Sequence, residues 1–408
     1  MKNKFNILDI ITIVILLWYI NPMSTDFYNW TYFAVLAFIW VVVATIENSE
    51  ALIESAVNAP VICYCLFLLV LFIYSLTGHA TFYFQSLSIP FAFVIGTYYI
   101  KHRSRESLRN VLTVGSIYIF IITVNTMFKL YTNPNISRYL AGGNTVVTRN
   151  LATPFTGGFT FVYATLLLSI NAFSNFLTSN KEKSKAYKFF NMVQLLLGTV
   201  LVLMAQYTTA LILLCAGYYL VVLYSPTNTR IKILSFFAVF VVALVVAFGV
   251  LPDIIESVAK FFPPEGGEMQ SHLMELAAVA RNGKSSADGL LRVRIFKSSL
   301  TLFYNNPIFG AGYSHNHQEI IDVFAEYGIL GGLPYFGAIF MMMKSVIKLF
   351  SKSLYKMSII IPYIIFSAYL FLDTAGDGLF YIVLFFILGA RTVMSDRITV
   401  MQTNTGDE

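Results

Sequence analysis

Long apolar runs recur along the whole chain and constrain its fold more than any other feature. Runs such as 30–46, 60–77 and 158–178 have the roughly 17–25 residues that a helix needs to cross a hydrocarbon core of about 30 Å. Backbone polar groups in lipid have no water to bond to, so continuous runs of this kind form helices. Only 12% of the residues are charged, about half the share in a soluble domain. The sequence therefore predicts an all-α polytopic membrane protein.

We expect about twelve membrane-spanning helices, several of them shorter than this range. They are 7–20, 30–46, 60–77, 86–100, 110–131, 158–178, 189–206, 209–224, 232–250, 318–343, 357–372 and 378–391. The first run resembles a signal peptide, but no small-residue cleavage site follows it and Asn21-Pro22 ends it like a turn. The prediction is a single membrane domain over 1–391, followed by a polar cytoplasmic tail at 392–408.

Basic residues are distributed unevenly between the expected loops. Most of the 27 lysines and arginines lie in short segments such as 101–109, 181–188 and 344–356, which share one side of the membrane in this topology. The positive-inside rule makes that side cytoplasmic, together with both termini. The other basic residues gather in two long outer loops, 129–157 and 251–317. Because charge confined to these loops suits an anionic substrate, the net charge of +6 is no sign of nucleic-acid binding.

The longer outer loop contains three helical stretches. The first, 252–262, reads as a short amphipathic helix lying on the membrane surface. The second covers 272–281. The third, 290–303, carries Arg292 and Arg294 and leads into the segment where polar residues concentrate.

That segment, 306–332, brings glycines, histidines and carboxylates together in an otherwise apolar sequence. Asn316 and Glu319 fit a capping box, which places His317 at the first helical position. The positive end of the helix disfavours an imidazolium there, so His317 would stay neutral and could act as a general base. The neighbouring His315 could act in the same way. The alternative is that both histidines are polar residues at the membrane interface with no catalytic role.

Three carboxylates follow on the same predicted helix. Glu319, Asp322 and Glu326 are spaced i, i+3, i+7 and therefore share a face. Glu326 lies roughly 13 Å deeper than His317 at 1.5 Å per residue. Carboxylates at such depth line a polar cavity or support a base, or they form a structural salt bridge with an arginine. The glycines further along predict close helix packing: Gly328, Gly331 and Gly332.

Arginines in the two outer loops are candidates for holding a diphosphate, because guanidinium groups match phosphate oxygens bidentately. The candidates are Arg292 and Arg294, with Arg138 and Arg149 from the shorter loop. The alternative is that each is a solvated loop charge. No HExxH motif and no paired outer carboxylates occur, so we expect neither a metal nor a cofactor. The three cysteines lie within predicted spans and indicate no disulfide or zinc site.

Three motifs then occur in a fixed order: Arg292-x-x-x-Phe296, the run from Asn306-Pro307 to Gly310-Ala311-Gly312, and His-x-Glu-x-Ile followed by Glu-Tyr-Gly-x-x-Gly. Together they resemble the family of O-antigen ligases and of O-antigen and capsular polysaccharide polymerases. Members are bacterial glycosyltransferases that act on undecaprenyl-diphosphate-linked sugars at the outer face of the cytoplasmic membrane. Their multi-span architecture with two large outer loops also matches the expected topology.

The resemblance bears on which histidine acts. In the family a histidine that opens a helix is usually followed by asparagine. Counting back from Glu326 and Gly328, His317 has the right register, with Gln318 in place of the asparagine. His315 heads the family's His-Asn dipeptide but lies two residues too early, so both histidines stay candidates and His317 is favoured.

The resemblance also bears on the arginines. Arg292 corresponds to the family arginine before the Asn-Pro run. A second family arginine corresponds to Arg149 by its distance to the next span, with Arg138 as the alternative. A Ser-Arg-Gly motif of many members has no counterpart, because 206–210 contains no arginine.

What the resemblance implies is metal-independent glycosyl transfer from a lipid-linked oligosaccharide donor to an acceptor. A bias toward Lys, Asn, Ile and Phe indicates a low-GC genome and favours a capsular or exopolysaccharide polymerase. The alternatives are an O-antigen ligase or another sugar transferase and, in a different class, a twelve-span transporter or flippase, which would show matching halves. The expected partners are the undecaprenyl-linked substrates, the bilayer, and a chain-length regulator and flippase of the same pathway.

Overall fold

The structure is a computed structural model. It describes residues 6–21, 30–78, 82, 84–141, 155–177, 185–224, 229, 232–233, 236–237, 251–260, 270–271, 273–274, 277–278, 281, 287–314, 318–349, 356–373 and 378–404. Within these ranges the chain is helical and contains no strand.

The helices follow one another along the chain with short connections between most neighbours. They are α1 (Ile7–Ile20), α3 (Trp30–Ala56), α4 (Ala59–Leu76), the 3-10 helix η1 (Phe84–Leu87), α5 (Ser88–His102), α6 (Arg105–Thr132), α7 (Ile136–Ala141), α9 (Phe159–Leu177), α10 (Lys185–Ala205), α11 (Thr208–Tyr224), α13 (Leu251–Ala259), α15 (Ala287–Asn305), α16 (Glu319–Leu349), α17 (Lys356–Leu372) and α18 (Gly378–Asn404).

The predicted spans coincide with these helices, apart from 232–250, most of which lies outside the described residues. By length and composition, six helices in the described part of the chain could cross a membrane: α3, α4, α6, α9, α10 and α16. Shorter apolar helices occur in α1, α11, α17 and α18. The amphipathic helix predicted at 252–262 is α13, and the stretch predicted at 290–303 lies within α15. Twelve spans and their sidedness stay predictions.

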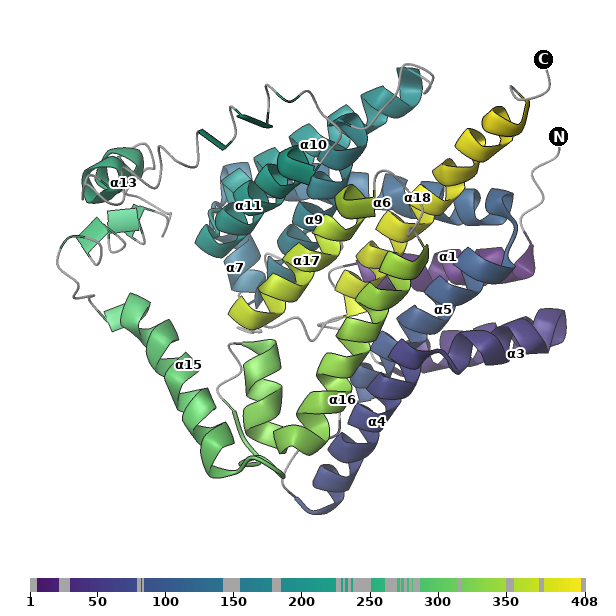
Figure 1. Cartoon of the computed structure of the whole chain (residues 1–408), viewed down its shortest axis with the longest axis horizontal. Helices are drawn as coiled ribbons and strands as arrows, with labels where there is room; N and C mark the ends of the chain where they lie inside the picture. Colours follow the sequence, from purple (N-terminus) through teal and green to yellow (C-terminus); the bar gives the residue numbers. More distant parts are fainter. Residues whose placement is uncertain are drawn as a thin grey trace.

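The core lies between α9 and α18, which are apolar around most of their circumference. Every residue of 161–172 is buried, and so is every residue of 379–387. A helix of this kind has no face suited to water, so it can face only lipid or other helices. Its burial within the protein shows that other helices surround it. Accordingly α18 packs against α5, α6, α9 and α17, while α9 packs against α10, α11 and α17. Figure 1 shows α9, α17 and α18 in the middle of the bundle.

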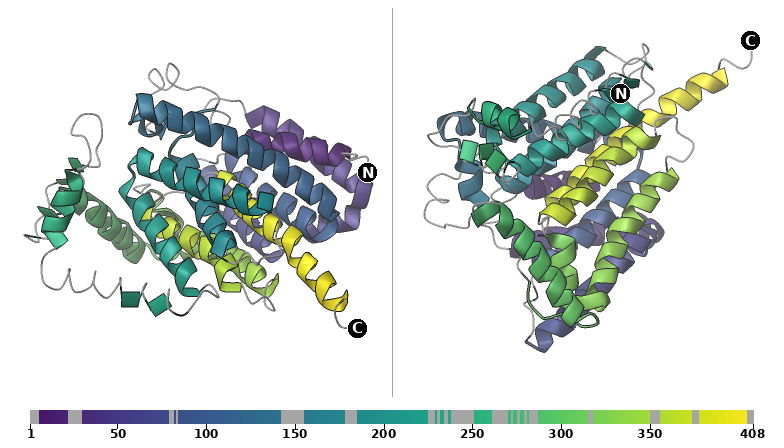
Figure 2. Two further views of the ribbon diagram at one scale, coloured as in Figure 1. Left: turned by 90° about the horizontal axis from the view of Figure 1, so that it is seen from above. Right: turned by 60° about the vertical axis from the view of Figure 1, so that its left-hand side comes forward.

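The two ends of the bundle differ. Figure 1 shows the start of α1 and the end of α18 on one side, with α7, α13 and α15 on the opposite side. In the left panel of Figure 2, α13 and α15 stand away from the packed helices. This arrangement agrees with a topology in which both termini share one side and the long loops share the other.

The helix α16 is interrupted at Gly328, where φ is 62° and ψ is −158°. Figure 1 and the right panel of Figure 2 show two arms that meet in a V. We call 319–327 the first arm and 329–349 the second arm. The V corrects the expectation of one uninterrupted helix over 318–343. The physical reason is that glycine, lacking a Cβ, adopts a backbone conformation that stops the helix and turns the chain.

Candidate functional site

The loop 306–314 crosses the break in α16 and pairs with its backbone. Its amides bond to carbonyl groups at the end of the first arm, and its carbonyl groups accept bonds from amides at the start of the second arm. The pairs are Ala311 N to Ala325 O (2.8 Å), Gly312 N to Glu326 O (3.0 Å), Ile329 N to Pro307 O (2.8 Å) and Leu330 N to Ile308 O (3.3 Å). Interrupting a helix within an apolar bundle leaves backbone groups without partners, and the loop supplies those partners.

Two glycines allow this close approach. Gly310 has a φ of 74°, and a Cβ added to it would lie 2.2 Å from the Glu326 carbonyl oxygen. A Cβ at Gly328 would lie 2.3 Å from the Ile308 carbonyl oxygen. Both distances are far below a van der Waals contact, so neither position accepts a side chain. We call this pairing of Gly310 with Gly328 the glycine crossing.

The other two glycines of the motif serve packing, as predicted. A Cβ on Gly332 would lie 2.3 Å from the Phe324 ring, and one on Gly331 would lie 2.4 Å from Tyr327 Cβ. Both neighbours belong to the first arm, so small residues on the second arm let the two arms of the V approach each other.

Glu319 joins the two arms of the V. Its carboxylate accepts a hydrogen bond from the Tyr335 hydroxyl group of the second arm at 3.0 Å. Its amide donates to the Asp373 carbonyl group at the end of α17 at 3.2 Å. The first helical residue of α16 is therefore held from two sides.

Asp322 is buried and binds two partners. Its Oδ1 atom accepts from the Ser299 hydroxyl group of α15, and its Oδ2 atom accepts from the backbone amide of Gln318, each at 2.7 Å. The first contact joins α15 to α16, and the second caps the start of α16.

Glu326 binds hydroxyl groups at the other end of the first arm. Its Oε2 atom accepts from Ser314 at 3.0 Å, and its Oε1 atom accepts from Tyr327 at 2.6 Å. Neither contact is the salt bridge with arginine that the sequence left open.

The three carboxylates have separate partners, because the folded-back second arm, α15 and the loop 306–314 each approach a different one. One expectation is corrected. The helix begins at Glu319 and not at His317, since the Gln318 carbonyl group accepts the first described helical bond, from Asp322 N at 2.8 Å.

Residues 193–336 match the sequence profile of a family described as O-antigen ligase. Over this stretch, about a third of its length, the chain is similar to that family. The matched part runs from α10 to the second arm of α16. It includes both segments that meet at the glycine crossing, the loop 306–314 and the break in α16. Members of the O-antigen ligase family are glycosyltransferase-like enzymes that act on lipid-linked sugars. A comparison with curated proteins finds no match.

The histidine candidates of the O-antigen ligase motif, His315 and His317, lie outside the described residues, as does Asn316. The residues on either side of them are described. Gln318, which stands in place of the family's asparagine, is 7% exposed, and its side-chain oxygen has no hydrogen-bond partner within the described part of the chain.

The arginine candidates belong to the two predicted outer loops. Arg294 is on α15 and its side chain is exposed. The backbones of Arg292 and Arg138 belong to α15 and α7, but their side chains lie outside the described residues, and Arg149 is outside them altogether. Arg281 is engaged with two carboxylates of α13, Asp253 and Glu256, at 2.5 and 2.8 Å. The hydrogen bonds to these carboxylates raise the pKa of the Arg281 guanidinium.

A continuous series of contacts connects α7 with the start of α16. The Tyr207 hydroxyl group donates to Ser137 of α7 at 3.1 Å. The Tyr207 ring stacks on Tyr163 of α9, whose ring lies 4.5 Å from that of Tyr369 on α17. The Tyr369 carbonyl group accepts from the amide of Asp373, whose own carbonyl group binds Glu319. The fold thus places the helix that bears Arg138 on the same side as the start of α16.

Asp373 is a residue of this site that the sequence reasoning did not single out. It ends α17, and its backbone links α17 to the first residue of α16. A sequence signal was available, because Asp373 lies directly after an apolar run, in the short connection between two predicted spans.

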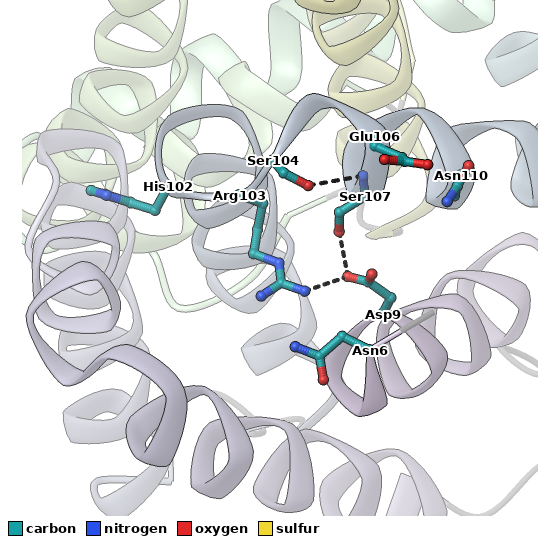
Figure 3. A pocket seen from close by; sticks show the side chains of 8 residues that line it. All are labelled: Asn6, Asp9, His102, Arg103, Ser104, Glu106, Ser107 and Asn110. Carbon is teal, nitrogen blue, oxygen red and sulfur yellow. Dashed lines mark hydrogen bonds and ion pairs between the residues drawn. The ribbon is translucent and has the colours of Figure 1, made fainter. Parts of the chain in front are cut away.

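A second polar cluster lies at the other end of α6, in a cavity of about 380 Å³ (Figure 3). Its centre is Asp9 on α1, which is 2% exposed and lies 2.7 Å from an Arg103 nitrogen. Arg103 also binds Glu47 at 2.6 Å, and the Ser107 hydroxyl group donates to Asp9. Burial lowers the pKa of Arg103, but the hydrogen bond and charge of Asp9 outweigh it, so the pKa is raised.

This cluster is remote from the loop and the V. It lies at the start of the 28-residue α6, about 42 Å along the helix axis from the α7 end. Its arginine is already bound to two carboxylates. We therefore interpret it as a structural clamp between α1, α3 and the α5–α6 turn. Within the described residues, no group of three or more His, Cys, Asp or Glu side chains could hold a metal ion.

Proposed function

We propose that this protein is a polysaccharide polymerase that joins undecaprenyl-diphosphate-linked oligosaccharide repeat units at the outer face of the bacterial cytoplasmic membrane. The observation that carries the proposal is the match of residues 193–336 to the O-antigen ligase family. Support comes from the glycine crossing, where two motifs of that family, the Asn-Pro run and the Glu-Tyr-Gly run, form one backbone-paired unit. The product would be a capsular polysaccharide, an exopolysaccharide or an O-antigen.

In the proposed reaction an acceptor sugar hydroxyl group attacks the anomeric carbon of the donor. The bond between that carbon and the diphosphate oxygen breaks, and the lipid diphosphate leaves with the bonding electron pair. The hydroxyl proton passes to His317, with His315 as the alternative and Glu319 as a further candidate. Arg292 and Arg149, or Arg138 in place of Arg149, would bind the diphosphate and stabilise its developing charge. Arg294 on the same helix would add positive charge.

The ligase alternative has the same support from the family match. A ligase transfers finished polymer to a different lipid acceptor, whereas a polymerase uses a lipid-linked repeat unit as both donor and acceptor. The composition bias toward Lys, Asn, Ile and Phe favours the polymerase. A chain-length regulator and a flippase of the same pathway would be its partners.

The test is a reconstitution of the purified full chain in liposomes with lipid-linked repeat units. The polymerase proposal expects a ladder of elongated lipid-linked products and release of free lipid diphosphate. Transfer only to a lipid A core acceptor would establish the ligase. If neither acceptor is used and labelled lipid-linked substrate moves across the bilayer unchanged, the transporter class is correct.

A parallel reaction in excess EDTA tests the expected independence from metal. Elongation should proceed at the same rate with and without the chelator. Loss of elongation that one divalent ion restores would overturn the metal-free reaction.

A further inference from the structure

The residues next to positions 315–317 are each bound to a carboxylate of the first arm. Ser314, on one side, donates its hydroxyl group to Glu326. Gln318, on the other side, donates its backbone amide to Asp322. The two carboxylates lie on one short rigid arm, four residues apart, which corresponds to about one helical turn. We call Asp322 and Glu326, with Ser299, Ser314 and Gln318, the carboxylate clamp.

Both carboxylates already have hydrogen-bond donors within the protein on each of their oxygens. Asp322 uses Oδ1 for Ser299 and Oδ2 for Gln318, and Glu326 uses Oε2 for Ser314 and Oε1 for Tyr327. Asp322 is 4% exposed and Ser299 is completely buried, so this half of the clamp has little contact with solvent. Such groups fix geometry well, because a hydrogen bond to a carboxylate is stronger than one between neutral groups.

The clamp also connects the elements on which the proposed reaction depends. Through Ser299 it holds α15, the helix of Arg292 and Arg294, against the start of α16. Through Ser314 it holds the end of the loop whose backbone crosses Gly328. Buried Ser299 and half-buried Ser314, each donating to one carboxylate, therefore set the register between α15, the loop and the first arm.

We propose that Asp322 and Glu326 are positioning residues that hold the chain on either side of the histidine motif, and that neither contacts the substrate. This inference rests on the proposed glycosyl transfer. It explains why carboxylates recur on this arm although each binds a different partner. It also assigns to Glu326 a role different from a salt bridge or a proton acceptor.

The experiment compares hydroxyl deletions in the clamp with matched deletions outside it. Ser314→Ala and Ser299→Ala each remove one donor to a carboxylate. Ser345→Ala and Thr301→Ala are the controls, because these exposed hydroxyl groups bond only to a carbonyl group of their own helix, on α16 and α15 respectively. Each variant is purified as the full chain, and kcat and KM for elongation are measured at equal amounts of folded protein.

We expect kcat to fall about 10–100-fold in Ser314→Ala, with the KM for the lipid-linked donor unchanged, because small displacements of a reacting group cost this much. Ser314→Thr retains the hydroxyl group and should recover most of the lost rate. The controls should match wild type. Glu326→Gln and Asp322→Asn should lower kcat in the same way. Adding a small carboxylate such as acetate to the assay should not restore their activity, because neither side chain is proposed to accept a proton.

Hydrogen exchange provides a readout that does not depend on activity. Amides of 312–318 should exchange at least about tenfold faster in the Ser314→Ala and Asp322→Asn variants, because local opening becomes easier, while amides of α9 should not change. Unchanged exchange, or a wild-type kcat in both serine variants, would overturn the clamp. A wild-type protein that transfers no sugar would instead overturn the proposed function, and the exchange data would separate the two failures.

Discussion

The Tyr335 hydroxyl group donates a hydrogen bond to the Glu319 carboxylate at 3.0 Å, although the two residues are sixteen positions apart in α16. In a continuous α-helix residues at this separation lie about 24 Å apart along the axis. The contact is therefore possible only because the chain reverses at Gly328. It holds the two arms of the V together at their open end, while the glycine crossing holds them at the apex.

This relationship predicts that the hydroxyl group of Tyr335 stabilises the V. Tyr335→Phe should lower the free energy of unfolding by about 1.5–3 kcal/mol, the range for a hydrogen bond to a charged group. Glu319→Gln should have a similar effect, and the double variant should cost less than the two separate losses together. The measurement is thermal unfolding of detergent-solubilised protein, with the exposed Tyr131→Phe as control. Additive losses would mean that the contact is not energetically coupled.

The glycine crossing predicts that neither glycine tolerates alanine. Gly328→Ala should cost about 1–3 kcal/mol from its backbone conformation alone. The clash of the new Cβ with the Ile308 carbonyl group adds to this. Gly310→Ala should be destabilising in the same way, because its new Cβ would clash with the Glu326 carbonyl group on the other side of the crossing. Gly337→Ala is the matched control on the second arm, where a Cβ would lie an ordinary 3.6 Å from Cys63 Sγ. Protease resistance and elongation activity are compared at equal membrane levels; wild-type values for Gly328→Ala would contradict the crossing.

The diphosphate role predicts that Arg292→Ala and Arg149→Ala abolish polymer while the protein stays in the membrane. Lysine at either position should restore little activity, because an ammonium group cannot make the bidentate contact. Arg281→Ala is the control, since its guanidinium is bound to Asp253 and Glu256 of α13. Polymer is followed by gel electrophoresis of lipid-linked products. Full activity in both alanine variants would remove these arginines from the reaction.

The histidine assignment predicts different outcomes for the two candidates. His317→Ala should leave single lipid-linked repeats with little or no polymer, since a general base contributes about 10²–10⁴-fold. His315→Ala should cost much less. Product ladders from both variants are compared at matched expression. An inactive His315→Ala beside a normal His317→Ala would mean that the His-Asn dipeptide identifies the base. Two normal ladders would make Glu319 the next candidate.

The Asp9–Arg103 ion pair, which lies far from the proposed site, predicts that breaking it lowers stability but not the activity of the folded protein. Arg103→Ala leaves Asp9 buried without its guanidinium partner, and breaking a buried pair in this way costs about 3–5 kcal/mol. Lys101→Ala removes an exposed pair with Glu54, which contributes little because solvent screens it, and serves as control. Thermal midpoints and activity per folded molecule are measured. A selective loss of activity in Arg103→Ala at normal stability would contradict the structural role.

The sequence predicted those features that depend on a single segment of the chain. The expected spans fell on helices such as α1 and α11 because apolar length alone decides which segments can enter a bilayer. The glycines of the Asn-Pro run also have a local role, because Gly310 and Gly312 both have positive φ, which a residue without a Cβ adopts readily. The concentration of glycines, histidines and carboxylates in 306–332 singled out the segment where the loop meets α16.

Pairing between distant segments required the tertiary structure. Spacing along a helix placed Glu319, Asp322 and Glu326 on one face, but it could not state that Tyr335, Ser299 and Ser314 approach from three directions. Gly328 was predicted to pack a helix, yet it ends the first arm, because the loop offers backbone partners that replace the helical hydrogen bonds. Asp9 and Arg103 likewise lie 94 positions apart in the sequence, and only the fold shows them as a pair. Apolar length is a property of each segment alone, whereas a hydrogen bond depends on where two segments are placed.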